Sequence, residues 1–267
     1  MRAYDAGLHL NEPIFAQYIT FLGAAVRLHF GYSLGLREPV GVAIRDHAGP
    51  TALLIVYSMI IALAIAVPLS LVVAKRRGSL IDHGVRGLGM ISFAMPPFWL
   101  GLILVLGLSV AVPLFPVSGY ASGFTGELRS LTLPALTLGL LFSPVFIRTL
   151  RASLLEVLDS EFVEASRARG LSERRVLYRH ALRPSSLPLV TLVGLTLGSL
   201  LSYTVVVENV FGIPGLGALL VTAVTNRDFP LVQGLVVVLG LAVVLINLAT
   251  DLLYGCVDPR VRLMATR

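Results

Sequence analysis

Apolar residues are concentrated in five long segments of the chain, and polar residues lie mainly between them. A helix needs about 20 mainly apolar residues to cross a bilayer. Each of the five segments reaches that length and has no Lys, Arg, Asp or Glu near its centre. The pattern therefore predicts an all-α, polytopic membrane helical bundle with five spanning helices, at residues 51–74, 88–112, 131–150, 187–210 and 231–254.

The composition agrees with a membrane protein. Hydrophobic residues make up 56% of the 267 residues and charged residues 13%, whereas soluble domains usually carry about 25% charged residues. The single cysteine, Cys256, excludes an internal disulfide and a multi-cysteine metal site, and we expect no resident metal. The net charge of +6 is arranged along the loops between the apolar segments, so it does not indicate a nucleic-acid partner.

Basic residues alternate between the loops. Three regions hold 15 of the 21 Lys and Arg residues: 75–87, 148–183 and the tail after residue 254. In membrane proteins the cytoplasmic loops carry the excess of Lys and Arg. We therefore expect these three regions, including the C-terminus, to lie in the cytoplasm.

With that orientation, the first fifty residues lie outside the cell. The apolar run at 14–26 is too short to span and is interrupted by polar residues, which predicts an amphipathic helix at the outer membrane interface. Because the region has no signal-peptide pattern, we expect a further spanning helix upstream and a natural start before Met1. The predicted organisation is an extracytoplasmic N-terminal region (1–50), a transmembrane domain (51–262) and a tail (263–267).

A charged segment in the middle of the chain, DSEFVEASRARGLSERRVLYRHALRPSS at 159–186, predicts two short helices joined by a turn. Asp159 or Ser160 can cap the first helix, which we expect to run to about Arg169. Gly170 then suits the left-handed position that ends a helix.

The second helix of this segment is expected to begin after Ser172, whose hydroxyl can accept a bond from a free amide, and to end near Leu182, before Pro184. The apolar residues fall on two faces, Phe162, Ala165, Ala168 and Leu171 on one and Val176, Leu177 and His180 on the other. We call the predicted helix–Gly–helix unit, at about 156–183, the elbow. It is small enough to insert into a groove on a partner. The alternative is a basic loop that only fixes topology.

Within the elbow, EASRARG followed by HAL resembles the cytoplasmic signature of permease subunits of ATP-binding-cassette (ABC) importers: Glu-Ala-Ala, three residues, Gly, then nine residues and a hydrophobic-x-Leu-Pro ending. Ser166 replaces the second alanine, His180 takes the hydrophobic place, and Arg183 replaces the final proline. Four further stretches resemble the B-type permease of dipeptide, oligopeptide and nickel importers: FGYSLG (30–35), PPFWLGLILVLGLSV…FPVSGY (96–120), VVENVFGIPGLGALLVTAVTNRDFPLVQG (206–234) and DLLYGCVDPRVR (251–262).

The resemblance implies that the elbow couples the permease to a separate ATPase, with the turn at 170–172 entering a cleft in that subunit. The residues assigned to ATPase coupling in this way are Glu164, Ala165, Ser166, Gly170, Leu171, Ser172, Glu173, Arg174, Arg175 and Leu182. The family's B-type subunit also begins with one more spanning helix, which agrees with the expectation from topology.

No GxxxxGK[ST] sequence occurs, so we expect the chain to be a transport subunit without an ATPase site, catalytic residues or a cofactor of its own. The resemblance implies that ATP and Mg²⁺ are bound by two partner ATPases. It also implies a second homologous permease, an extracytoplasmic substrate-binding protein and the bacterial inner membrane. The expected function is half of the pathway of an ATP-driven importer for di- or oligopeptides. A nickel or other small-solute importer of the same family is the alternative.

Two polar residues are candidates for the substrate pathway. Glu208, at the outer edge of its span, is either a snorkelling interfacial acid or a polar group at the substrate entrance. Asn247, deep in a span, makes either an interhelical hydrogen bond or a substrate contact. GLTLG at 194–198 allows close helix approach, within the chain or to the sister permease. Pro96 and Pro97 predict a bend in their helix.

The pattern disfavours functions of two other classes. A secondary transporter or channel usually places ionisable residues at mid-membrane, and the five predicted spans have none there. An intramembrane serine protease needs a histidine beside a serine within the membrane. All five histidines lie outside the predicted spans.

Overall fold

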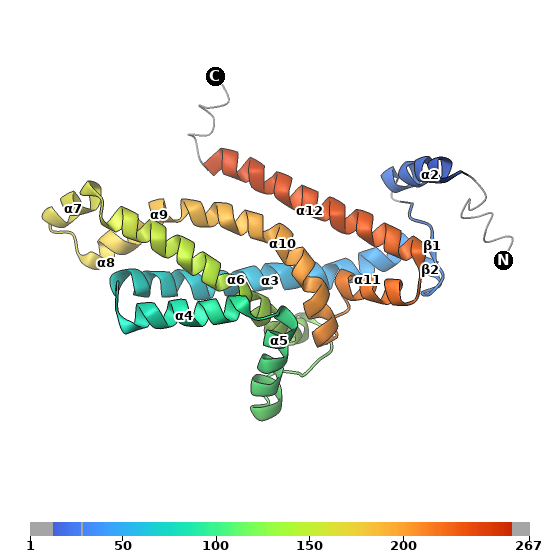
Figure 1. Ribbon diagram of the computed structural model, residues 1–267, viewed down its shortest axis with the longest axis horizontal. Helices are drawn as coiled ribbons and strands as arrows, with labels where there is room; N and C mark the ends of the chain where they lie inside the picture. Colours follow the sequence, from blue (N-terminus) through green and yellow to red (C-terminus); the bar gives the residue numbers. More distant parts are fainter. Residues whose placement is uncertain (1–12, 28, 258–267) are drawn as a thin grey trace, which may run out of the picture.

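The protein is an elongated bundle of helices with one two-stranded hairpin (Figure 1). This computed structural model describes residues 13–27 and 29–257. In chain order the helices are α2 (Ile14–Val26), α3 (Val40–Lys75), α4 (Leu80–Ala94), α5 (Pro97–Val105), α6 (Phe124–Leu158), α7 (Glu161–Ala168), α8 (Glu173–Arg175), α9 (Leu182–Ser185), α10 (Leu187–Phe211), α11 (Leu216–Thr225) and α12 (Phe229–Val257). Turns of π-helix follow α5 (Leu106–Ala111) and α8 (Val176–Ala181), and β1 (Tyr32–Ser33) pairs antiparallel with β2 (Glu38–Pro39).

Four of the five predicted spans are confirmed as single helices that are long and apolar enough to cross a membrane: α3, α6, α10 and α12. The start of α3 lies at Val40, eleven residues before the predicted residue 51. Its first turns expose Arg45 and Asp46. They bury three apolar side chains against α11 and α12, namely Val40, Ala43 and Ile44. Because this start is amphipathic, no continuous apolar run reveals it.

The fifth predicted span, at 88–112, is not one continuous helix. The chain breaks between α4 and α5, and the two halves meet at 110°. Pro96 has an extended backbone (φ −59°, ψ 139°) and Pro97 occupies the first position of α5. Because neither proline has an amide hydrogen to continue the helix, the predicted bend becomes a complete break.

The centre of the bundle lies between α3 and α6, which pack along their length. Two-thirds (67%) of the apolar window of α6 is buried within the chain, against 22% of that of α12. Helix α6 is therefore central, and α12 lies at the edge of the bundle, as Figure 1 shows. Large side chains that are fully buried in the core include Leu54, Leu138, Phe146, Leu150 and Leu154.

The predicted close helix approach at 194–198 is confirmed, and the partner is α12 of the same chain. A methyl group added at Gly194 would lie 1.9 Å from Cγ2 of Thr250, and one at Gly198 would lie 2.9 Å from Oδ1 of Asn247. A larger residue at Gly194 would displace α12, whereas one at Gly198 would require the Asn247 side chain to turn away. The glycine pair therefore fixes the contact between α10 and α12.

The hairpin is attached to the turn before α12 by a buried aspartate. Oδ2 of Asp228 accepts hydrogen bonds from the hydroxyl of Ser33 (2.5 Å) and the amide of Gly35 (2.9 Å). A helix at 14–26 is confirmed as α2, and it buries no residue against the bundle. Its place at a membrane interface stays a prediction.

Candidate functional site

The elbow lies at one end of the bundle, between the C-terminus of α6 and the N-terminus of α10 (Figure 1). Its first helix is α7, which begins after Ser160 and ends at Ala168. Gly170 then has φ of +77°, and its amide donates to the carbonyl of Arg167 at 2.8 Å. The predicted first helix and its left-handed glycine are both confirmed.

The second half of the elbow differs from its prediction. It does not end before Pro184 but continues from α8 through a π-helical turn into α9, which contains this proline. Pro184 is the third residue of α9, directly after the π-helical turn, and its position there shows that the proline does not end the helix. The side chain of Ser172 makes no capping hydrogen bond. The hydroxyl of Ser160 also does not cap α7 and donates to the carbonyl of Val157 instead.

The inward face of α7 is not the one that carries Phe162, Ala165 and Ala168, which are exposed. Phe162 is 54% exposed, and the residues that face inward are Val163 and Ser166, both fully buried. The hydroxyl of Ser166 donates to the carbonyl of Phe162 at 2.8 Å. Ser166 therefore packs inside the chain and presents no surface to a partner, because the inward face is set by tertiary packing and not by the spacing of apolar residues alone.

The other coupling residues divide by exposure. Leu171 and Leu182 are partly buried. Seven are exposed: Glu164, Ala165, Gly170, Ser172, Glu173, Arg174 and Arg175. We call these seven residues the elbow surface. They lie on both sides of the Gly170 turn, in α7, in the turn itself and in α8.

Two of the charged groups in the elbow pair with each other. Nε of Arg167 lies 2.9 Å from Oε1 of Glu173 and joins α7 to α8 across the Gly170 turn. Exposed pairs of this kind stabilise a fold by about 1 kcal/mol or less. The pair therefore helps to orient the turn. Glu164, Arg174 and Arg175 have no ion pair within the described part of the chain.

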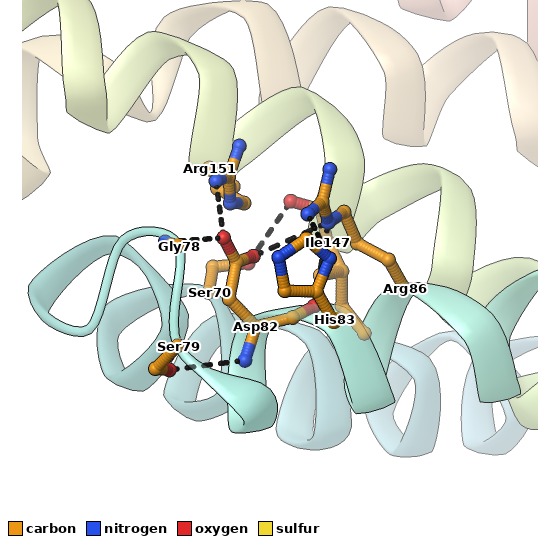
Figure 2. Close-up of polar contacts among 8 residues, drawn as sticks. All are labelled: Ser70, Gly78, Ser79, Asp82, His83, Arg86, Ile147 and Arg151. Atoms are coloured by element: carbon orange, nitrogen blue, oxygen red, sulfur yellow. Dashed lines mark hydrogen bonds and ion pairs between the residues drawn. The ribbon is translucent and has the colours of Figure 1, made fainter.

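A buried acid connects α4 to α6, the helix that leads into the elbow (Figure 2). Oδ2 of Asp82 accepts hydrogen bonds from Nη2 of Arg151 (2.7 Å) and from the amide of Gly78 (3.1 Å). Nε of Arg86 lies 3.4 Å from Oδ1. The Asp82 side chain is 1% exposed and that of Arg151 18%. The charges are therefore screened little by solvent, and they hold the start of α4 against α6.

This ion pair was not predicted, because the basic residues of the loop at 75–87 indicate only its topology. Two local signals were present. Asp82 is the single acid among the basic residues of that loop. Ser79 and Asp82 also have the spacing of a helix cap, and the amide of Asp82 donates to the hydroxyl of Ser79 at 3.3 Å. Neither signal identifies Arg151, which lies 69 residues away.

Glu208 is fully buried, so its interpretation as a snorkelling acid is wrong. Its Oε1 accepts a hydrogen bond from the hydroxyl of Thr51 in α3 (2.6 Å). Its Oε2 accepts from the amides of Gly217 (2.8 Å) and Ala218 (3.0 Å) in the first turn of α11. The carboxylate therefore joins α3, α10 and α11.

We expect Glu208→Ala to lower the free energy of unfolding by about 1–3 kcal/mol, because buried donors on Thr51, Gly217 and Ala218 lose their acceptor. Glu208→Gln is the matched control. Its amide oxygen can accept from the two backbone amides, so only the Thr51 hydroxyl loses its acceptor, and the loss should be about 1 kcal/mol, smaller than for Glu208→Ala. Thermal unfolding in detergent measures both changes. Equal losses for the two variants would contradict this role.

Asn247 is exposed on α12. Within residues 13–27 and 29–252, no hydrogen bond joins its side chain to another helix, so the predicted interhelical bond is not formed among these residues. Glu208 and Asn247 are not brought into contact, and their place on a substrate pathway stays a prediction. In the same described ranges, no group of three His, Cys, Asp or Glu residues could hold a metal ion.

Comparison with known proteins places the chain in a family. Residues 66–263 match the family model described as binding-protein-dependent transport system inner membrane component. The dipeptide transport system permease protein DppB of Escherichia coli (strain K12) is 36% identical over 283 residues, covering 96% of this chain and 84% of the relative. The oligopeptide transport system permease protein AppB of Bacillus subtilis (strain 168) is 38% identical, covering 94% and 82%. The nickel import system permease protein NikB of Staphylococcus aureus (strain MRSA252) is 37% identical, covering 96% and 75%.

Solved structures with a similar fold are also transporters. The MetNI methionine ABC transporter, in an inward-facing conformation, has a chain that matches with a TM-score of 0.67 at 20% identity, covering 81% of this chain and 96% of that one. A chain of an amino acid ABC transporter matches with a TM-score of 0.61 at 14% identity, covering 79% and 92%. These likenesses confirm the predicted helical membrane fold.

Proposed function

The chain belongs to the family of binding-protein-dependent transport system inner membrane components, and from this premise we propose that it forms half of the translocation pathway of an importer for di- or oligopeptides. As a member it is a multi-pass inner-membrane permease subunit of an ABC importer, of the branch that includes peptide and nickel permeases, and not an ATPase. The proposal adds the class of transported substrate and the coupling of transport to a partner ATPase.

The observation that carries the coupling proposal is the folded elbow. Its exposed residues surround the Gly170 turn, while Val163, Val176 and Leu177 are buried at its base. Helix α7 follows α6 closely, and α9 leads directly into α10. A short, packed unit of this kind transmits a displacement to two long helices, whereas a flexible loop would absorb it. The elbow surface is therefore suited to bind a partner whose movement is passed on to α6 and α10.

We propose that this partner is an ATPase subunit that binds ATP and Mg²⁺. A binding-protein-dependent ABC transporter has ATPase and binding-protein partners. The proposed assembly contains this chain, a second homologous permease, two ATPases and an extracytoplasmic substrate-binding protein. The elbow and the C-terminus lie on the cytoplasmic side, in agreement with the basic residues at 75–87 and 148–183. Closure of the two ATPases would move both elbows and open the permeases to the other side.

The names of the relatives support peptides as the substrate. Two of the three relatives compared above are named as permeases for dipeptides and oligopeptides, and the third is named as a nickel permease. Nickel import is therefore the second candidate. Their identities to this chain lie between 36% and 38%, so identity alone does not separate the two substrates.

The test is uptake by the complete transporter in proteoliposomes, with the binding protein outside and ATP inside. We expect labelled di- or oligopeptides to accumulate and nickel not to accumulate. Accumulation of nickel alone would overturn the substrate proposal. Transport by the purified chain without ATPases would overturn the coupling proposal and indicate a secondary transporter or channel.

A further inference from the structure

Helix α12 exposes polar and small residues along one line, beside the exposed Val236 and Val244. Gln233, Gly240 and Asn247 are each seven residues apart, and Asp251 follows one turn later; all four are exposed. Seven residues are almost two turns of 3.6 residues, so the four positions lie on one face. We call them the polar stripe. Gln233 and Asp251 are 18 residues apart, about 27 Å along the helix at 1.5 Å per residue. This length is close to the apolar thickness of a bilayer, about 30 Å.

A second exposed line on the same helix has a different chemistry. It consists of leucines that are 49–65% exposed, also spaced by three or four residues: Leu241, Leu245, Leu248 and Leu252. We call these the leucine stripe. Leucine is suited to lipid, whereas transfer of an unpaired amide to an apolar phase costs about 2–7 kcal/mol. The two exposed lines of α12 therefore favour different surroundings: lipid suits the leucine stripe, and the polar stripe needs hydrogen-bonding partners from water, a substrate or another chain.

The neighbouring helix adds polar groups at the same contact. The side chain of Asn247 lies against Gly198 of α10. Ser199 and Ser202, one and four residues beyond this glycine, are exposed. Exposed hydroxyl groups on α10 therefore lie within about one helical turn of the glycine that contacts Asn247.

We propose that the polar stripe, together with Ser199 and Ser202, forms part of the wall of the translocation pathway and contacts the backbone of the transported peptide. This inference rests on the proposed function and adds the surface that the substrate meets. A side-chain amide has the same donor and acceptor groups as a peptide bond, so Gln233 and Asn247 can bind a peptide backbone whatever its side chains are. Such contacts suit a permease that passes peptides of varied sequence.

The experiment measures access of water to each line of α12 in the complete transporter in membrane vesicles. In a Cys256→Ser background, single cysteines replace Gln233 and Asn247 in the polar stripe, and Leu241 and Leu248 in the leucine stripe. The probe is a membrane-impermeant methanethiosulfonate. We expect Gln233→Cys and Asn247→Cys to react at least tenfold faster than the two leucine variants, and the reaction at Asn247→Cys to block peptide uptake.

Equal or faster reaction of the leucine variants would overturn the inference. The inference would also be overturned if neither polar position reacted, because the polar stripe would then face lipid or the sister permease. ATP-dependent peptide uptake by the Cys256→Ser background tests the proposed function separately. Normal uptake with an unreactive polar stripe therefore rejects the pathway wall alone, whereas absent uptake with intact membrane insertion rejects the function.

Discussion

Gly170→Pro is expected to lower substrate uptake at least tenfold while leaving membrane insertion unchanged. Gly170 has φ of +77°, whereas proline fixes φ near −65°. The substitution also removes the amide that donates to the carbonyl of Arg167. The turn between α7 and α8 must therefore rearrange, and the elbow surface loses its shape. ATP-dependent uptake and co-purification of the ATPase from detergent measure the effect.

Gly170→Asn is the matched control. Asparagine tolerates the left-handed conformation, and no neighbouring atom lies within 4 Å of the position where a side chain would begin. We expect this variant to retain more uptake and more bound ATPase than Gly170→Pro. Unchanged uptake in Gly170→Pro would show that the turn does not transmit motion.

Asp82→Ala is expected to lower the free energy of unfolding by about 3–5 kcal/mol, because it leaves the charge of Arg151 largely buried without a partner. Asp159→Ala is the control, since it removes an aspartate–arginine pair at the same end of the bundle. The pair between Arg77 and Asp159 is 65% and 69% exposed, so its loss should cost about 1 kcal/mol or less. Thermal unfolding of the two variants in detergent separates the effects. Equal shifts would show that the Asp82 cluster does not anchor α4.

The buried acids hold the long helices together at two places along the bundle. Asp82 anchors α4 to α6 near the elbow, and Glu208 joins α3, α10 and α11 farther along the bundle. Thr51, the partner of Glu208, lies 24 residues before the end of α3 at Lys75, about 36 Å along the helix. Polar contacts toward both ends thus hold the long helices together. The polar stripe and the leucine stripe of α12 take no part in these contacts.

Features with a local cause were predictable from the sequence. Long apolar runs indicate α3, α6, α10 and α12, because length and apolarity are properties of one segment. The turn between α7 and α8 was also predictable, because Gly170 belongs to one of the few residue types that readily adopt a left-handed backbone. The start of α3 at Val40 was not predictable, because its amphipathic first turns depend on packing against α11 and α12.

Features that depend on distant residues could not be predicted. The inward side of α7 is determined by what it packs against, so Ser166 is buried where a contact with a partner was expected. The partners of Asp82 and Glu208 lie 69 and 157 residues away. For Pro96 and Pro97, the sequence indicates a bend but not its size, because the angle of 110° depends on how the two halves pack.

The most direct test of the coupling is cross-linking of the elbow to the ATPase in native membranes. Ser172→Cys in a Cys256→Ser background places one thiol on the elbow surface, and cysteines introduced along the ATPase provide the other. We predict a disulfide between Ser172→Cys and at least one ATPase cleft position, at a yield that changes when ATP is added. No cross-link at any ATPase position, while uptake remains ATP-dependent, would contradict the account.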